Sequence, residues 1–118
     1  MNKRTEGSKW EAVAGDFLTR HGIDITEYNF RCRFGEIDII GNDKGTIVFY
    51  EVKYRKDSAY GSPAEAVGIK KQKVIAKVSD YYRMLNNIPW DTPIRYDVVA
   101  IQGNRIELIP AAFMRMGF

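Results

Sequence analysis

Three charged residues lie inside two short apolar runs, where ionised side chains are rare. The first run, Gly-Glu-Ile-Asp-Ile-Ile at residues 35–40, holds Asp38 between isoleucines. The second, Val-Phe-Tyr-Glu-Val-Lys at residues 48–53, holds Glu51 and Lys53. An ionised group in an apolar strand is strongly unfavourable unless a partner or a metal ion offsets it. The placement of these charges therefore indicates a site.

The spacing of the charges predicts that they meet across a β-hairpin. Side chains alternate faces along a strand, so Glu36 and Asp38 share one face. The linker between the runs, Gly-Asn-Asp-Lys-Gly, is a hairpin signal. A two-residue turn at Lys44 and Gly45 would set Asp38 opposite Glu51, with Cβ atoms about 5 Å apart. A longer loop would shift this register by a residue or two.

Such an arrangement is typical of a metal site. Two carboxylates that close repel each other, and a divalent cation is the usual remedy. Lys53, two residues after Glu51, points into the same space. A purely structural alternative makes Glu51 and Lys53 members of a buried ion-pair network. Apolar residues would serve stability better there, so the site is the favoured interpretation.

An Asp followed by Glu-x-Lys on paired strands resembles the metal site of the PD-(D/E)XK nuclease superfamily. Other stretches extend the resemblance over nearly the whole chain: Glu11, residues 31–38, 51–53, 61–67 and 95–99. In this order and spacing the chain resembles the YraN-like family of small bacterial proteins, which is similar in layout to archaeal Holliday-junction resolvases. Ile37 stands where the superfamily's name implies proline, a residue that is often absent there.

The resemblance implies a nuclease that uses Mg²⁺ or Mn²⁺ and cuts phosphodiester bonds, with DNA, and branched or junction DNA in particular, as the favoured substrate. The residues themselves do not distinguish DNA from RNA, or duplex from branched substrates. It implies that Asp38 and Glu51, with Glu11 acting through water, hold the ion. Lys53 would then orient the attacking water and stabilise the transition state. The alternative is a non-catalytic nucleic-acid-binding or assembly module that keeps the nuclease fold.

Three further residues are candidates for places beside the metal ligands. Glu36 lies on the Asp38 face and could bind a second metal ion or pair with an arginine. Lys71 falls in line with the apolar residues of its predicted helix, so we expect it to tuck towards the sheet at the rim of the site, where the family also has a lysine. Asp97 is favoured as a structural partner of an arginine, with a contact to the site as the alternative.

Composition fits one domain, residues 1–118, with 45% hydrophobic residues and a net charge of +3. This charge permits nucleic-acid binding without requiring it. The candidates for phosphate contact are Arg31, Arg33, Arg55, Lys70 and Lys73. A solvated strand edge is the alternative for Arg31 and Arg33, and a solvated helix face is the alternative for the lysines. No apolar run is long enough for a membrane span, no signal peptide is recognisable, and a single cysteine fits a reducing compartment. We therefore expect a cytoplasmic protein that does not associate with a membrane. We expect no small-molecule cofactor.

The periodicity predicts an α/β (α+β) fold with a mixed central sheet flanked by helices, as in the restriction-endonuclease-like core. The expected order is one helix, three strands, a long helix and two strands. The predicted ranges are a helix at 8–20, a strand at 23–33, the two charged strands, a loop at 54–61, a helix from 62 to about 86, and strands at 94–101 and 105–109. Ser62 to Glu65 reads as a helix start with a capping box.

The end of the chain, residues 111–118, carries four large apolar residues and is expected to form a short helix. These side chains could pack on the core or on a second copy of the chain, so a homodimer is possible. Cys32 is expected to be a packing residue rather than a nucleophile. His21 is expected to interact with the dipole at a helix C-terminus.

Overall fold

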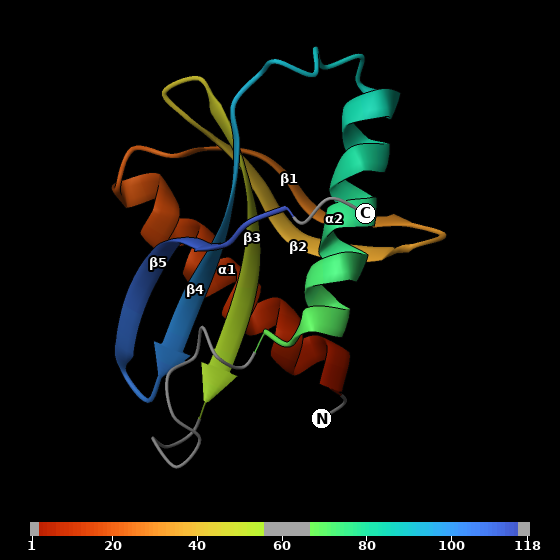
Figure 1. Ribbon diagram of the computed structural model, residues 1–118. Helices are drawn as coiled ribbons and strands as arrows, with labels where there is room; N and C mark the ends of the chain where they lie inside the picture. Colours follow the sequence, from red (N-terminus) through yellow and green to blue (C-terminus); the bar gives the residue numbers. More distant parts are fainter. Residues whose placement is uncertain (1–2, 56–66, 116–118) are drawn as a thin grey trace.

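A five-stranded mixed sheet carries one helix on each face in the computed structural model of the chain (Figure 1). The structure describes residues 3–55 and 67–115, and the side chains from residue 8 onwards. Helix, three strands, helix and two strands follow one another, so the predicted α/β class and order are confirmed. The elements are α1 (Lys3–Arg20), β1 (Asp24–Cys32), β2 (Gly35–Asp43), β3 (Thr46–Arg55), α2 (Ile69–Leu85), β4 (Ile94–Gln102) and β5 (Arg105–Phe113).

The strands lie side by side in chain order, from β1 at one edge to β5 at the other. Three neighbouring pairs are antiparallel, and β3 and β4 alone run parallel. Parallel neighbours need a long crossover connection, and α2 lies between these two strands in the chain. Neither α1 nor α2 has the length and apolar character that crossing a membrane would require.

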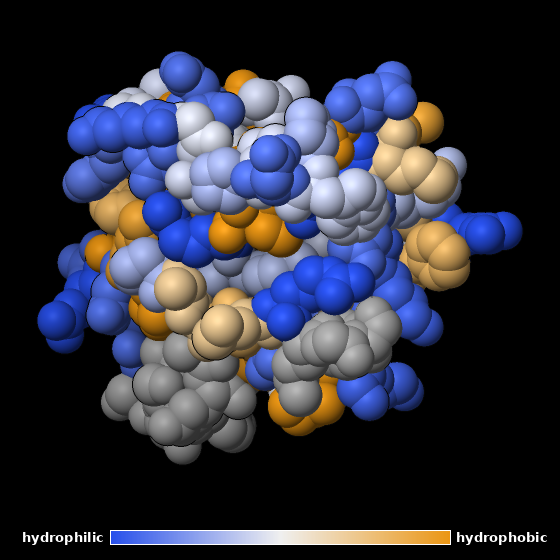
Figure 2. All heavy atoms as spheres, turned by 45° about the horizontal axis from the view of Figure 1, so that its top comes forward, coloured by the Kyte–Doolittle hydropathy of each residue, from blue (hydrophilic) through white to orange (hydrophobic). Residues whose placement is uncertain are grey.

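Alternation along the central strands builds two cores, one under each helix. Val48 and Tyr50 of β3 pack in the cluster that contains Leu18 of α1. Phe49, between them, packs in the cluster that contains Val78 of α2. The strand at the centre of the sheet is therefore apolar on both faces, as buried strands are. On the face shown in Figure 2, hydrophilic side chains predominate and the hydrophobic ones form small, separate groups.

The hairpin between β2 and β3 has the predicted two-residue turn. Asp43 pairs with Thr46, and Lys44 and Gly45 between them have φ of 52° and 98°. Both turn residues thus have the positive φ that the tightest hairpin turn needs. The ladder runs on to the pair of Ile39 and Tyr50. The predicted register is confirmed, because Asp38 and Glu51 are the next residues along the two strands.

The beginning of α2 differs from the prediction. The helix begins at Ile69, and its N-cap Gly68 is extended, with φ of −69° and ψ of 167°. One continuous helix from residue 62 is therefore wrong, because glycine resists the helical state and here takes another conformation. The proposed capping box from Ser62 to Glu65 lies outside the described residues. Tyr54 and Arg55 belong to β3 rather than to the predicted loop, the rest of which is also outside them.

The end of the chain differs as well. Strand β5 continues to Phe113, so the helix predicted from residue 111 is wrong over its described part. Phe113 pairs with Tyr96 of β4, and the two rings stack with centroids 5.1 Å apart. Cross-strand pairing and ring packing outweigh the weak local helix signal. Phe113 thus uses its apolar surface in the core of its own chain, whereas Met114 is 80% exposed.

Candidate metal centre

The site lies where β2 and β3 part. Their backbone pairing ends at Ile39 and Tyr50, and beyond this pair the carboxylate of Asp38 bonds to the backbone of β3. Its Oδ2 accepts a hydrogen bond of 2.9 Å from the backbone N–H of Val52. The side chain of Asp38 is therefore held against β3 at the point where the strands stop pairing.

Helix α1 closes the site from the other side. A cavity of about 220 Å³ is lined by Trp10, Glu11, Asp38, Glu51, Val52 and Tyr54. The structure thus brings together the three carboxylates that were expected to hold a metal ion, from α1, β2 and β3. Glu51 is 7% exposed and its charge is almost wholly removed from solvent.

Glu36 joins the same group. One carboxylate oxygen from each of Glu11, Glu36 and Asp38 lies within 4.8 Å of the others. Glu36 also forms an ion pair with Arg31. Both uses proposed for Glu36 from its sequence position are therefore compatible with its place. It belongs to the carboxylate group more closely than its expected position beside the ligands implied.

Burial and mutual repulsion make these carboxylates hold protons unusually well. Burial, followed by the charge of Asp38, raises the pKa of Glu11 from 4.5 to about 7. The same two causes raise the pKa of Glu51 from 4.5 to about 7, against the opposing charges of Lys71 and Lys53. Burial also raises the pKa of Asp38, although the hydrogen bond from Val52 opposes the shift. A divalent cation would relieve this repulsion, and an all-oxygen donor set suits Mg²⁺ or Mn²⁺.

Two lysines border the carboxylates. Lys53 Nζ lies 3.6 Å from Glu51 Oε1, and the Lys53 side chain is 28% exposed, so it contacts both the site and solvent. Lys71, in the first turn of α2, lowers the pKa of Asp38 and Glu51 through its charge. The side chain of Lys71 is exposed, so the expectation that it would tuck towards the sheet is wrong. The expected place at the rim of the site agrees with this arrangement.

Three residues of the site escaped the sequence analysis. The rings of Trp10 and Tyr54 stack 3.9 Å apart, at 11° to each other, and form an apolar wall of the cavity. Within the described part of the chain, the buried Nε1 of Trp10 has no hydrogen-bond partner. Asn29, with φ of 53°, hydrogen-bonds to Glu11 and partly offsets the rise of its pKa. The available signals were a tryptophan beside Glu11, a tyrosine beside Lys53 and an asparagine within a strand.

Asp97 occupies a different position. It is fully buried, and it accepts hydrogen bonds of 2.8 and 2.9 Å from Arg95 and one of 2.8 Å from the backbone N–H of Ala111. Arg95 also reaches Asp43 at 3.1 Å. This is the structural ion pair that the sequence favoured for Asp97.

The basic residues expected to contact phosphates lie on three elements. Arg31 and Arg33 are exposed near the turn between β1 and β2, and Lys70 and Lys73 are exposed on α2. Arg55 is half-buried at the end of β3. Arg31 lies on β1, Arg55 on β3, and Lys70 and Lys73 on α2, whereas Arg33 lies in the turn between β1 and β2.

The amino-acid sequence is similar to those of a protein family of uncharacterised function. The family model described as "Uncharacterised protein family UPF0102" matches residues 10–101, a range that contains Glu11, Asp38, Glu51 and Lys53. A UPF0102 protein of Lachnoclostridium phytofermentans is 44% identical over 117 residues, covering 99% of each chain. One of Syntrophus aciditrophicus is 47% identical over 117 residues, covering 96% of this chain and 91% of its own. One of Caldicellulosiruptor bescii is 44% identical over 119 residues, covering 96% of this chain and all of its own.

Proposed function

The chain belongs to the UPF0102 family, and we propose that it is a metal-dependent nuclease of the PD-(D/E)XK type that hydrolyses phosphodiester bonds in DNA. One observation carries this proposal. Glu11, Asp38 and Glu51 line a single cavity beside the ammonium group of Lys53. Carboxylate oxygens can hold the metal ion that phosphodiester hydrolysis uses, and a neighbouring lysine ammonium can stabilise the negative charge that develops on the phosphate.

Asp38, Glu51 and Glu11 would hold a Mg²⁺ or Mn²⁺ ion, with Glu36 adjoining them. When bound, such an ion lowers the pKa of a water molecule and offsets negative charge on the scissile phosphate. The hydrogen bond from Val52 fixes the carboxylate of Asp38, so one donor is oriented before any ion arrives. Preorganised donors favour both metal affinity and catalysis, because less ordering remains to be done on binding.

The remaining groups act on the substrate and on protons. Lys53 reaches solvent from its ion pair with Glu51, so its ammonium can approach a phosphate oxygen as negative charge grows there. Glu11 has a pKa of about 7 in the absence of an ion, so at neutral pH it gives up its proton readily when an ion binds. The Trp10–Tyr54 stack excludes water from one side of the cavity. Each of these roles rests on a group that already lies beside the carboxylates.

The surface supports a nucleic-acid substrate. The chain carries 18 basic and 15 acidic residues, and several carboxylates are gathered in the site. Exposed cations lie on α2, at Lys70 and Lys73, and near the β1–β2 turn, at Arg33 and at Arg31, which pairs with Glu36. Contacts from such side chains to phosphates hold a nucleic acid in place without reading its bases. We accordingly propose a preference for DNA shape, such as branches or junctions, over sequence.

A cleavage assay tests the function directly. Wild-type protein with Mg²⁺ or Mn²⁺ is incubated with linear duplex, single-stranded, flapped and four-way DNA, and with duplex RNA. We expect metal-dependent cutting, fastest on branched DNA, and none by the Glu51→Gln variant. If no substrate is cut, the affinity of the protein for the same DNA and RNA substrates distinguishes the alternatives. Binding without cutting under all conditions would leave a non-catalytic nucleic-acid-binding module, and the absence of both would leave an assembly module.

A further inference from the structure

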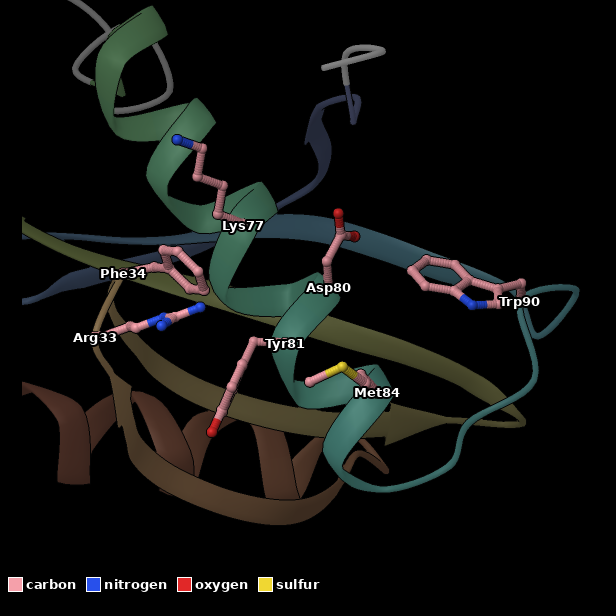
Figure 3. A pocket seen from close by; sticks show the side chains of 7 residues that line it. All are labelled: Arg33, Phe34, Lys77, Asp80, Tyr81, Met84 and Trp90. Carbon is pink, nitrogen blue, oxygen red and sulfur yellow. The ribbon is translucent and has the colours of Figure 1, made fainter.

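A second hollow lies at the opposite end of α2 from the carboxylate site. It is an open groove of about 670 Å³, and Figure 3 shows the side chains that line it: Arg33, Phe34, Lys77, Asp80, Tyr81, Met84 and Trp90. The four α2 residues recur at spacings of three and four, so they form one stripe along the helix. Arg33 and Phe34, from the turn after β1, lie on one side of this stripe, and Trp90 lies beyond Met84.

The groove exposes large apolar side chains. Phe34 is 39% exposed, Met84 63% and Trp90 65%. A tryptophan is seldom this exposed in a folded domain, because its burial is worth a large hydrophobic free energy. The ring of Phe34 meets that of Tyr81 edge to face, with centroids 6.2 Å apart. Flat aromatic faces are therefore available along the floor and at both ends of the groove.

These rings are held in place rather than loosely attached. The buried Arg83 donates a hydrogen bond of 2.9 Å to the carbonyl of Trp90, and its guanidinium lies 4.3 Å from the centroid of the Trp90 ring. The guanidinium of Arg33 lies 4.9 Å from the centroid of the Phe34 ring. A ring that is already oriented loses little conformational freedom when a ligand stacks on it.

The charges of the groove are mainly positive. Asp80, the one acidic residue among the described residues that line the groove, accepts a hydrogen bond of 3.0 Å from Arg115 and forms an ion pair with it. Lys77 and Arg33 add positive charge at the surface. Arg83 adds more from beneath, since its described partners are carbonyl oxygens and the Trp90 ring. The groove thus fits a ligand that combines flat apolar groups with negative charge.

The geometry points to a binding site for unpaired nucleotides, whose bases stack on Phe34, Tyr81 and Trp90 and whose phosphates contact Arg33 and Lys77. Proteins that bind single strands combine such aromatic platforms with a positive groove. This inference deepens the proposed nuclease function and rests on it for the identity of the ligand. It assigns the substrate a single-stranded segment, as a flap or an overhang provides.

Helix α2 connects the groove with the carboxylate site. Lys71 acts on Asp38 and Glu51 at one end, and Lys77 lines the groove six residues later, about 9 Å along the helix axis. Met84 lies about 20 Å from Lys71 along the same axis. That length corresponds to about six nucleotides at a stacked spacing of 3.4 Å. A strand entering the carboxylate site could therefore continue along α2 into the groove.

Fluorescence anisotropy in EDTA tests the groove independently of metal and of cleavage. The probes are a labelled thymidine oligonucleotide and an abasic oligomer of the same length, which carries the phosphates without bases. We expect Trp90→Ala and Phe34→Ala each to weaken thymidine binding roughly 5- to 150-fold, the range for loss of one stacked base. Abasic binding should stay unchanged in both. Leu85→Ala is the matched control, because Leu85 is 56% exposed on α2 outside the groove lining.

Several results would overturn this inference. Wild-type affinity in the Phe34→Ala Trp90→Ala double variant would do so, as would an equal loss of abasic binding. Trp90-dependent binding of polyglutamate, with no effect on thymidine binding, would make the groove a site for acidic peptides instead. Cleavage of linear duplex separates the two proposals. If the double variant binds normally and the wild type cuts, the groove fails alone; if Trp90-dependent binding occurs without any cutting, the nuclease proposal fails alone.

Discussion

Glu11 and Glu51 are ordinary glutamates that their surroundings turn into groups titrating near neutral pH. Burial is the larger cause for each, and the charge of Asp38 is the next. Each folded-state pKa is about 7, above the ordinary value of 4.5. Between these two pH values the folded chain binds more protons than the unfolded chain. The free energy of unfolding therefore falls as the pH rises from about 4.5 through 7, unless a cation takes the place of the protons.

This pH dependence predicts an unusual response to Glu51→Gln. In metal-free buffer at pH 8 the variant should melt at a higher temperature than wild type, because it removes a buried repelling charge. At pH 5 the two should melt at nearly the same temperature, since Glu51 is then protonated. Mn²⁺ at pH 8 should raise the melting temperature of the wild type more than that of the variant.

Thermal denaturation followed by circular dichroism measures these shifts. Glu107→Gln serves as the matched control, because Glu107 is exposed on β5. It should show neither the pH effect nor the smaller response to Mn²⁺. A Glu51→Gln variant that responds to Mn²⁺ as strongly as wild type would exclude Glu51 as a ligand.

Lys53 allows catalysis to be separated from metal binding. Lys53→Met keeps the length of the side chain but removes its charge, so calorimetry should find Mn²⁺ affinity within a few-fold of wild type. Cleavage should fall by two orders of magnitude or more, the usual loss when a charge-stabilising donor is removed. Lys44→Met, in the hairpin turn away from the site, should cut at the wild-type rate. Wild-type cleavage by Lys53→Met would show that Lys53 has only a structural role.

At the scale of elements, the sequence predicted the helices and strands correctly where one strong local signal determined the geometry. The two-residue turn at Lys44 and Gly45 set the register of β2 and β3, and with it the approach of Asp38 to Glu51. The period of α1 and Gly22 with φ of 86° marked the end of that helix at Arg20. The approach of Glu11 to these carboxylates depends on helix–sheet packing, so only the family resemblance indicated it.

The predictions were wrong where contacts between distant parts of the chain, or competing local signals, determined the secondary structure. Residues 111–113 have no strong strand pattern, yet they continue β5, because Phe113 stacks on Tyr96 and the backbone N–H of Ala111 donates a hydrogen bond to Asp97. The predicted start of α2 was wrong because the sequence has a strong capping signal upstream, at residues 62–65, which favoured a helix across the break at Gly68. The groove at the far end of α2 was also missed, since it joins residues from three parts of the chain that no local pattern links.

The ion pair between Arg95 and Asp97 joins β4 to the end of β2 through Asp43. Arg95→Leu should lower the free energy of unfolding by roughly 3–5 kcal/mol, because it leaves the fully buried Asp97 without a counter-charge. Asp43→Asn, at a side chain that is 29% exposed, should change it by about 1 kcal/mol or less. Urea denaturation measures both variants. Equal effects of the two substitutions would mean that Asp97 is adequately held by the Ala111 N–H alone.

At the scale of the whole molecule, the proposed function is compatible with one copy of the chain or with two. Under the proposed function, a single carboxylate site would cut one strand, and a homodimer would address two symmetric strands. The apolar end of the chain was the candidate interface. Phe113 packs inside its own chain, so of the described residues near this end Met114 offers the most exposed apolar side chain.

Substitutions at these two neighbours distinguish core packing from assembly. Phe113→Ala should lower the free energy of unfolding by roughly 2–3 kcal/mol at any protein concentration, because it removes a packed ring from the core. Met114→Ala should change it by no more than about 0.5 kcal/mol. Denaturation at several protein concentrations, with sedimentation for molecular mass, measures both. A concentration-dependent loss in either variant would instead place this end of the chain in a subunit interface.

The sheet order also sets the sequence of events during synthesis on the ribosome. Glu11, Asp38, Glu51 and Lys53 have all been translated once β3 is complete, yet the neighbour of β3 on its open side is β4, which follows α2. At 5–20 residues per second, roughly, the nascent chain exposes an apolar strand edge for several seconds before β4 arrives. In this hairpin Asp38 and Glu51 lie at the next positions after the last paired residues of β2 and β3, where two carboxylates repel each other. A divalent cation bound at the proposed site would offset this repulsion, so it would stabilise the hairpin during folding as well as serve the proposed reaction.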